Sequence, residues 1–254
     1  MSYIILIINE LKKLGKEIKR YYFEFISGTI IMFGIFLALF FGLKNFAGDS
    51  LEATSLDSLI VGYILWGIAM QSFQSVSSMI WDESQKGTLE KLYLSHLGIE
   101  KIFLAKVFAS ILFTIFFNVV ILFLAMLITG RWLNINYPYF IFMIIISVIS
   151  LVGIGFAGGG IAIIHKKVTS IFSIFSFGII GLMALTTYPM NVFSFLPYVP
   201  GAKTLIGSIV HGQTYPLWWY GFIFVTSLVY LVGGLYLFKI YDRKARKMNK
   251  LGVY

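Results

Sequence analysis

The sequence predicts an all-α membrane protein with six transmembrane helices and an interfacial helix before them. Two elements complete the predicted fold: a cytoplasmic helix between the second and third spans, and a re-entrant outer helical hairpin before the last span. Hydrophobic residues make up 59% of the 254 residues, charged residues only 12%, and the mean hydropathy is +0.88. A soluble domain carries about 25% charged residues. We therefore expect one membrane domain over residues 1–254.

Six apolar segments have the length that a transmembrane helix needs. A hydrocarbon core of about 30 Å requires roughly 20 residues at a rise of 1.5 Å per residue. Together the segments predict a six-span bundle over residues 23–240. They are Phe23–Leu43, Leu59–Met79, Val107–Thr129, Phe140–Ile164, Val168–Tyr188 and Leu217–Lys239.

Residues 1–22 carry a helical pattern of apolar and basic positions. Ile4, Ile8, Leu14 and Ile18 recur at helical spacing, with lysines between them. This pattern is typical of an amphipathic helix in the membrane interface, with its lysines toward anionic headgroups. The alternative is a solvated helix, which has no need for so apolar a face.

The distribution of lysine and arginine predicts the orientation of the chain. With the N-terminus inside, the cytoplasmic segments contain 17 of the 20 basic residues and the outer loops contain 3. Cytoplasmic loops of membrane proteins carry such an excess. We therefore expect a multi-pass protein of the cell (inner or cytoplasmic) membrane, with both termini cytoplasmic and a basic tail over 241–254.

The outer segment before the last span, Pro189–Pro216, is long for a connection but still apolar. A water-exposed loop would be more polar, so the segment predicts one or two short helices that dip into the outer leaflet, broken by Pro197 and Pro200. Trp218 and Trp219 follow directly. They fit either an interfacial aromatic belt or the aromatic lining of an exit path.

Polar residues within the predicted spans are uncharged. No ionisable residue lies in the middle of a span, which argues against a proton-coupled carrier and against a membrane enzyme. Gln71, Gln74 and Asn118 fit interhelical hydrogen bonds or the wall of a wet cavity on a transport pathway. Gly155 and Gly159 form a small-xxx-small pair for close helix packing, and a glycine hinge is the alternative.

The sequence contains no motif for binding a metal or a nucleotide. It has no cysteine, and its three histidines lack the spacing of metal ligands. It also has no GxxxxGK[ST] phosphate loop, so this chain is not expected to hydrolyse ATP. We expect no catalytic residue, no metal site and no cofactor bound by this chain.

The segment Trp81–Leu97, WDESQKGTLEKLYLSHL, is a polar, helix-prone stretch between long apolar runs. Charges alternate in sign along it, and Lys86 and Glu90 are spaced for an i,i+4 ion pair. Leu89 and Leu92 begin an apolar stripe at helical spacing. A helix that docks into a partner's groove needs such a stripe, whereas a solvated surface helix does not.

A longer motif in this segment carries a family resemblance. The chain reads Glu83-x-x-x-Gly87-Thr88-Leu89-Glu90-x-Leu92, followed by Lys106 at the entry to the third span. This resembles the cytoplasmic loop of ABC-2 type transporter permeases of the drug-resistance and polysaccharide-exporter kind. The resemblance extends through the interfacial helix, the six spans and the outer hairpin. His96 departs from it, because members commonly have a proline there.

The resemblance implies the permease subunit of an ATP-binding cassette exporter, which forms the translocation pathway and couples it to separate ATPase subunits. Two permease copies, identical or related, would pair as a dimer above two nucleotide-binding subunits that hold ATP and Mg. The loop helix would be the coupling helix between permease and ATPase. The implied coupling residues are Glu83, Lys86, Gly87, Thr88, Leu89, Glu90, Leu92 and Tyr93.

The same resemblance implies efflux of a cargo rather than an enzymatic reaction in this chain. Uncharged, aromatic-rich spans suit an amphipathic drug, a lipid-linked molecule or a glycan as cargo. Membrane lipid is the other expected partner, and nucleic acid is not expected. The alternatives are a self-contained channel or secondary carrier without an ATPase, a lipid-handling membrane enzyme, and a regulatory subunit that moves no cargo.

Overall fold

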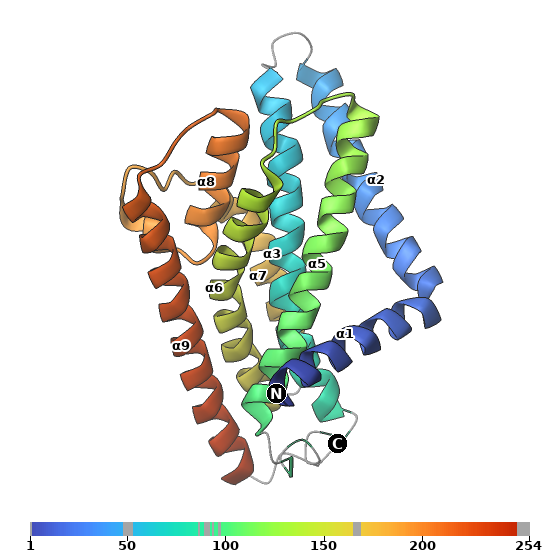
Figure 1. Ribbon diagram of the computed structural model, residues 1–254, viewed down its shortest axis with the longest axis vertical. Helices are drawn as coiled ribbons and strands as arrows, with labels where there is room; N and C mark the ends of the chain where they lie inside the picture. Colours follow the sequence, from blue (N-terminus) through green and yellow to red (C-terminus); the bar gives the residue numbers. More distant parts are fainter. Residues whose placement is uncertain are drawn as a thin grey trace.

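The computed structural model describes residues 2–47, 53–85, 87–88, 92, 94–95, 98–164 and 169–247. These residues form helices and no strand, which confirms the predicted all-α class. Figure 1 shows long helices side by side, with α1 crossing one end of the bundle. The elements are α1 (Ser2–Arg20), α2 (Tyr22–Ala47), α3 (Ala53–Gln85), α5 (Ile99–Thr129), α6 (Tyr137–Ile164), α7 (Thr169–Met183), the 3-10 helix η2 (Val192–Phe195), α8 (Val199–Val210) and α9 (Leu217–Lys247).

Among the described residues, five helices are long and apolar enough to cross a membrane, namely α2, α3, α5, α6 and α9. They coincide with five of the six predicted spans, and they support a multi-pass membrane protein. The C-terminal end of α9 and the helix α1 lie at the same end of the bundle (Figure 1). The placement of both ends on the cytoplasmic side of the membrane stays a prediction.

The remaining predicted span, Val168–Tyr188, forms a shorter helix than expected. Its first residue lies outside the described residues, and α7 has 15 residues and ends at Met183. At 1.5 Å per residue this helix covers about 22 Å, less than a hydrocarbon core of about 30 Å. The β-branched Thr186 and Thr187 and the ring of Pro189 disfavour its continuation. Hydropathy alone does not detect this helix end.

The central helix is α6, whose apolar stretch is 67% buried. A Cβ atom on Gly153 would lie 2.1 Å from a backbone carbonyl oxygen of α9, and one on Gly234 of α9 would lie 1.9 Å from the Gly153 carbonyl oxygen. On the side of α6 that faces α3, a Cβ on Gly155 would lie 2.7 Å from the Cβ of Val76. These glycines bring helices into backbone contact, and α6 continues through them as one helix.

The outer segment forms two short helices, η2 and α8, between α7 and α9. Pro197 separates them, whereas Pro200 lies in the first turn of α8, where its missing N–H leaves no helical hydrogen bond unmade. The hydroxyl of Tyr198 donates a hydrogen bond to the carbonyl of Leu65 at 2.6 Å and so fixes α8 to α3. Insertion of this segment into the outer leaflet stays a prediction.

Candidate functional site

The predicted coupling helix begins as the last turns of α3. That helix continues to Gln85, so Glu83 extends a membrane helix instead of starting a separate one. The chain then turns at Gly87, whose φ of 64° lies in the left-handed region that favours glycine. One helix over Trp81–Leu97 was therefore the wrong expectation, because a glycine in this conformation ends a helix.

Glu83 is the centre of a polar network at this end of the bundle. Its carboxylate lies 2.5 Å from the Nζ atom of Lys106 in α5, and the two side chains are 17% and 9% exposed respectively. The hydroxyl of Thr88 donates to the other carboxylate oxygen, and the Thr88 N–H donates to the Glu83 carbonyl at 3.1 Å. We call Glu83, Thr88 and Lys106 the inner network. It joins the end of α3, the turn and α5.

The surroundings of Glu83 lower its pKa. Burial raises the pKa of this carboxyl, but the hydrogen bonds from Lys106 and Thr88 and the charges of Lys106 and Lys13 outweigh burial. The pKa of Glu83 therefore lies below its ordinary value, and the carboxylate is ionised at neutral pH. Because both partners are poorly exposed, water screens their attraction less than it screens a surface pair.

The other predicted coupling residues differ in their exposure and contacts. Gly87 is exposed, and Thr88 belongs to the inner network. Leu92 is half-buried and packs against the hydrophobic core of this chain, so it is not free to fill a partner's groove. Leu94, which the motif does not include, is 84% exposed. The residues that lie outside the described ones are Lys86, Leu89, Glu90 and Tyr93.

A hollow lies between α1 and α2 on one side and α3 and α5 on the other. Its main part is a cavity of about 540 Å³, within the range of roughly 300–1,000 Å³ that is usual for ligand sites. A chamber of about 340 Å³ shares Gln74 and Phe117 with this cavity. A further chamber of about 220 Å³ shares Ser75 and Ser78 with the second and reaches the inner network. The hollow therefore connects the bundle interior with the proposed coupling region.

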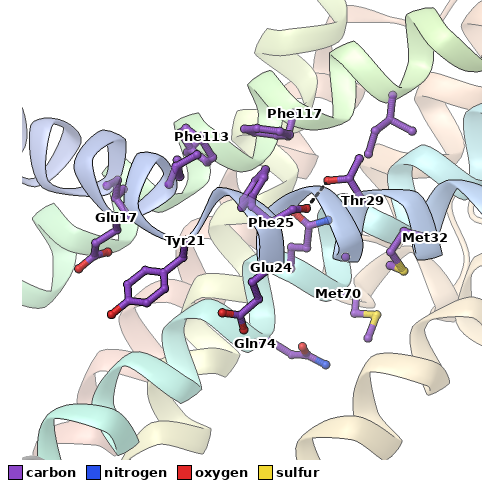
Figure 2. A pocket seen from close by; sticks show the side chains of 15 residues that line it. Glu17, Tyr21, Glu24, Phe25, Thr29, Met32, Met70, Gln74, Phe113 and Phe117 are labelled. Carbon is purple, nitrogen blue, oxygen red and sulfur yellow. Dashed lines mark hydrogen bonds between the residues drawn. The ribbon is translucent and has the colours of Figure 1, made fainter.

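Aromatic rings form one wall of the main cavity, as Figure 2 shows. The ring centroid of Phe25 in α2 lies 4.3 Å from that of Phe117 and 5.9 Å from that of Phe113, both in α5. The two α5 rings lie 4.7 Å apart. Among the described residues that line this cavity, the charged ones are Glu17 and Glu24. The cavity can therefore hold an apolar ring and meets water at an acidic rim.

The predicted pathway residues on α3 and α5 lie close together. Gln71 and Gln74 line the main cavity. Asn118 is 2% exposed, donates to the carbonyl of Thr114 at 2.9 Å, and lies 3.5 Å from the side-chain oxygen of Gln71. Gln74 donates to the hydroxyl of Ser176 in α7 at 3.4 Å. The two glutamines are thus both cavity wall and helix contact, while the asparagine is structural.

The predicted exit residues on α9 lie elsewhere. Trp219 is fully buried, and its indole N–H donates to the hydroxyl of Thr204 in α8 at 2.8 Å. Trp218 is 54% exposed. The structure does not bring this pair into contact with the glutamines of the cavity, because those glutamines lie on α3, whereas α9 packs mainly against α6. Gly159, the second predicted packing glycine, is buried in α6.

Sequence reasoning missed the rim carboxylates and the aromatic wall. Phe113 and Phe117 are one helical turn apart, but such a pair in a membrane helix fits a lipid-facing surface equally well. Glu17 and Glu24 lie on two helices that meet at Tyr21, and only the angle between the helices brings them to one mouth. The described residues contain no cluster of three or more His, Asp or Glu side chains that could hold a metal ion.

Comparison with protein families gives a match to the model described as CcmB protein. It covers residues 23–192, more than half of the chain. The matched region runs from the start of α2 to the start of η2 and contains the inner network and most of the cavity wall. A comparison with curated proteins found no match.

Proposed function

The chain belongs to the CcmB family, and from this membership we propose that it is the permease subunit of an ATP-driven exporter. CcmB proteins are membrane permease components of ABC-type heme exporters. They act with other ABC transporter components, among them an ATPase. The ABC-type permease expected from the loop motif is supported at this level. The finer resemblance to ABC-2 permeases of the drug-resistance kind stays a prediction.

Heme is the cargo that the family membership favours. It is a flat amphipathic molecule, and the sequence led us to expect an amphipathic cargo. Heme therefore takes precedence over the drug, lipid-linked molecule or glycan proposed from composition. ATP and Mg would be bound by the partner ATPase, and this chain would supply the pathway and the mechanical link.

The inner network is the observation that supports coupling. A force on the turn at Gly87 would pass through Thr88 to Glu83 in α3 and through Lys106 to α5. Both helices form walls of the hollow, so their displacement would change its shape. The low exposure of the ion pair matters here, because a fully hydrated pair would rearrange under load.

A second permease copy remains part of this proposal. The apolar stretch of α2 is only 11% buried within one chain. Exposed apolar residues such as Phe23, Ile30 and Ile31 lie along it. Lipid or a second permease would cover this face, and the family's exporter architecture favours the permease for at least part of it.

The test is purification of this protein from its native host in mild detergent, with identification of the subunits that co-elute. We expect a stoichiometric subunit with a GxxxxGK[ST] loop. ATP hydrolysis by the complex should drive heme transport in vesicles. Elution without an ATPase, from cells that express one, would favour the self-contained channel or carrier instead.

Variants of the inner network test the coupling itself. The double variant Glu83→Ala/Lys106→Ala removes the pair without leaving one charge unpaired. We expect it to retain the fold but to lose most ATP-driven transport. Lys101→Ala is the matched control, since Lys101 is an exposed lysine at the start of the same helix as Lys106. Equal transport by the double variant and the wild type would remove the network from the mechanism.

A further inference from the structure

We propose that the cavity between α1–α2 and α3–α5 binds an organic cation with an aromatic body. This site does not depend on the proposed heme transport, because its charge and lining select a different class of ligand. Three features carry the inference: an acidic hollow in a basic protein, an aromatic wall, and an open mouth at the turn between α1 and α2.

The hollow is acidic although the chain has a formal net charge of +9. The main cavity and the innermost chamber are lined by five described carboxylates and two described lysines, a formal charge of −3. Glu83 is paired with Lys106, and Glu17 lies 3.9 Å from Lys13. Glu24 has no ion pair among the described residues. The carboxylates in the hollow are Glu10, Glu17, Glu24, Asp82 and Glu83.

The wall of the cavity provides what a lipophilic cation needs. Aromatic faces attract cations through their quadrupole, most strongly where water is excluded. Phe25, Phe113 and Phe117 are half-buried in contact with one another, and Tyr21 lies at the rim. Figure 2 shows the Tyr21 ring and the Glu24 carboxylate on the same side of the cavity. An aromatic cation would place its rings among the phenylalanines and its charge near Glu24.

The mouth of the cavity is accessible. Tyr21 is 52% exposed, and Glu17 and Glu24 are exposed as well. All three lie at or beside the junction of α1 and α2, where the amphipathic helix would meet the inner leaflet. Amphipathic cations concentrate at an anionic leaflet surface. They would therefore reach this opening from the membrane side.

The same features disfavour heme in this cavity. The propionate carboxylates of heme would meet the rim carboxylates Glu17 and Glu24, whereas the described residues that line the main cavity include no lysine, arginine or histidine. Like charges at close range repel. A cation and heme are therefore expected to use different sites on the protein.

The experiment uses tetraphenylphosphonium and tetraphenylborate, ions of nearly equal shape and opposite charge. Binding of each to the purified full complex, without nucleotide, is measured separately by equilibrium dialysis. We expect saturable binding of the phosphonium and at least tenfold weaker binding of the borate. Tight binding of both ions, or of the borate alone, would overturn the proposal.

Four variants locate the binding site. Glu24→Gln should weaken phosphonium binding by roughly two- to fivefold, the usual size for a partly exposed charge, and Glu24→Asp should restore it. Phe117→Ala should weaken binding about tenfold, because a desolvated cation–π contact is lost. Phe108→Ala is the matched control, since Phe108 lies on the same helix but is 45% exposed and does not line the cavity. An unchanged affinity in both Glu24→Gln and Phe117→Ala would overturn the proposal.

Two further readouts separate this proposal from other outcomes. Native mass spectrometry detects any phospholipid in the complex. A lipid that saturating phosphonium does not displace, but that Phe117→Ala removes, would identify the cavity as a lipid site and overturn the proposal. Glu24→Gln should still co-purify with the ATPase and retain ATP-driven heme transport. Failure of cation binding with intact transport therefore contradicts only this inference, and failure of transport in the wild type contradicts only the proposed function.

Discussion

At the scale of a single residue, the contacts of Glu83 are the part of the candidate site that the motif alone does not show. The family resemblance selects this glutamate and places Lys106 further along the chain. Spacing cannot show that the two side chains meet, because they lie on different helices 23 residues apart. Nor does it show that Thr88 binds the same carboxylate. The contact depends on how α3 and α5 pack, which the sequence pattern does not determine.

Removal of Lys106 alone should destabilise the fold. Lys106→Ala leaves the 17%-exposed Glu83 carboxylate without its counter-charge. A broken buried pair of this kind costs on the order of 3 kcal/mol, with some relief from water in the adjoining chamber. The double variant Glu83→Ala/Lys106→Ala should recover most of the loss. Thermal unfolding in detergent measures both, and a double variant no more stable than Lys106→Ala would contradict the assignment.

The lowered pKa of Glu83 predicts a stability loss in acid. Because the pKa is lower in the folded than in the unfolded protein, the ion pair contributes fully above the unfolded value of about 4.5, and the contribution disappears as pH falls through the folded value. Below pH 4.5 the unfolding temperature of the wild type should fall more steeply than that of the double variant. Parallel curves would show that Glu83 contributes nothing to stability.

At the scale of helices, glycine placement is only partly predictable from spacing. The small-xxx-small rule selects Gly155 and Gly159, but the backbone contact between α6 and α9 involves Gly153 and Gly234. These two lie on helices that are far apart in the sequence, so no local pattern pairs them. The predicted length of α7 was also wrong. The residues beyond Met183 are apolar enough to be predicted as part of a span, but the helix ends at Met183.

Two neighbouring glycines of α9 provide a matched test of this packing. A Cβ on Gly234 would lie 1.9 Å from the Gly153 carbonyl oxygen, whereas one on Gly233 would meet nothing within 4 Å. Gly234→Ala should therefore cost roughly 1–3 kcal/mol through overpacking. Gly233→Ala should be neutral or stabilising by up to about 1 kcal/mol, because alanine favours the helix. The difference in unfolding temperature checks this, and equal effects of both changes would contradict the α6–α9 contact.

At the scale of the whole molecule, composition predicts that the chain is a membrane protein, but it does not predict the cavity. Charged residues at 12% and long apolar runs require a membrane protein, and the charge asymmetry predicts one orientation. The hollow arises only from the angle between α1 and α2, which holds Phe25 and Glu24 away from Gln74 on α3 (Figure 2). No periodic pattern encodes this angle, so the cavity could not be predicted from the sequence.

The central claim is that ATPase motion reaches the outer side of the bundle through the inner network. The chain contains no cysteine, so two introduced cysteines are its only sites for spin labels. Trp132 and Leu217 suit this purpose, because they are 68% and 87% exposed. Trp132 lies in the connection between α5 and α6, and Leu217 is the first residue of α9. The double variant Glu83→Ala/Lys106→Ala, which removes the pair without leaving one charge unpaired, and the control Lys101→Ala are introduced into this labelled protein.

The measurement is the distance between the two labels by pulsed electron paramagnetic resonance, in the ATPase complex, with and without trapped nucleotide. We predict a distance distribution that shifts with nucleotide in the otherwise unchanged protein and in Lys101→Ala, and that no longer shifts in Glu83→Ala/Lys106→Ala. A distribution that does not change with nucleotide in a complex with active ATPase, or a full shift in the double variant, would contradict the account.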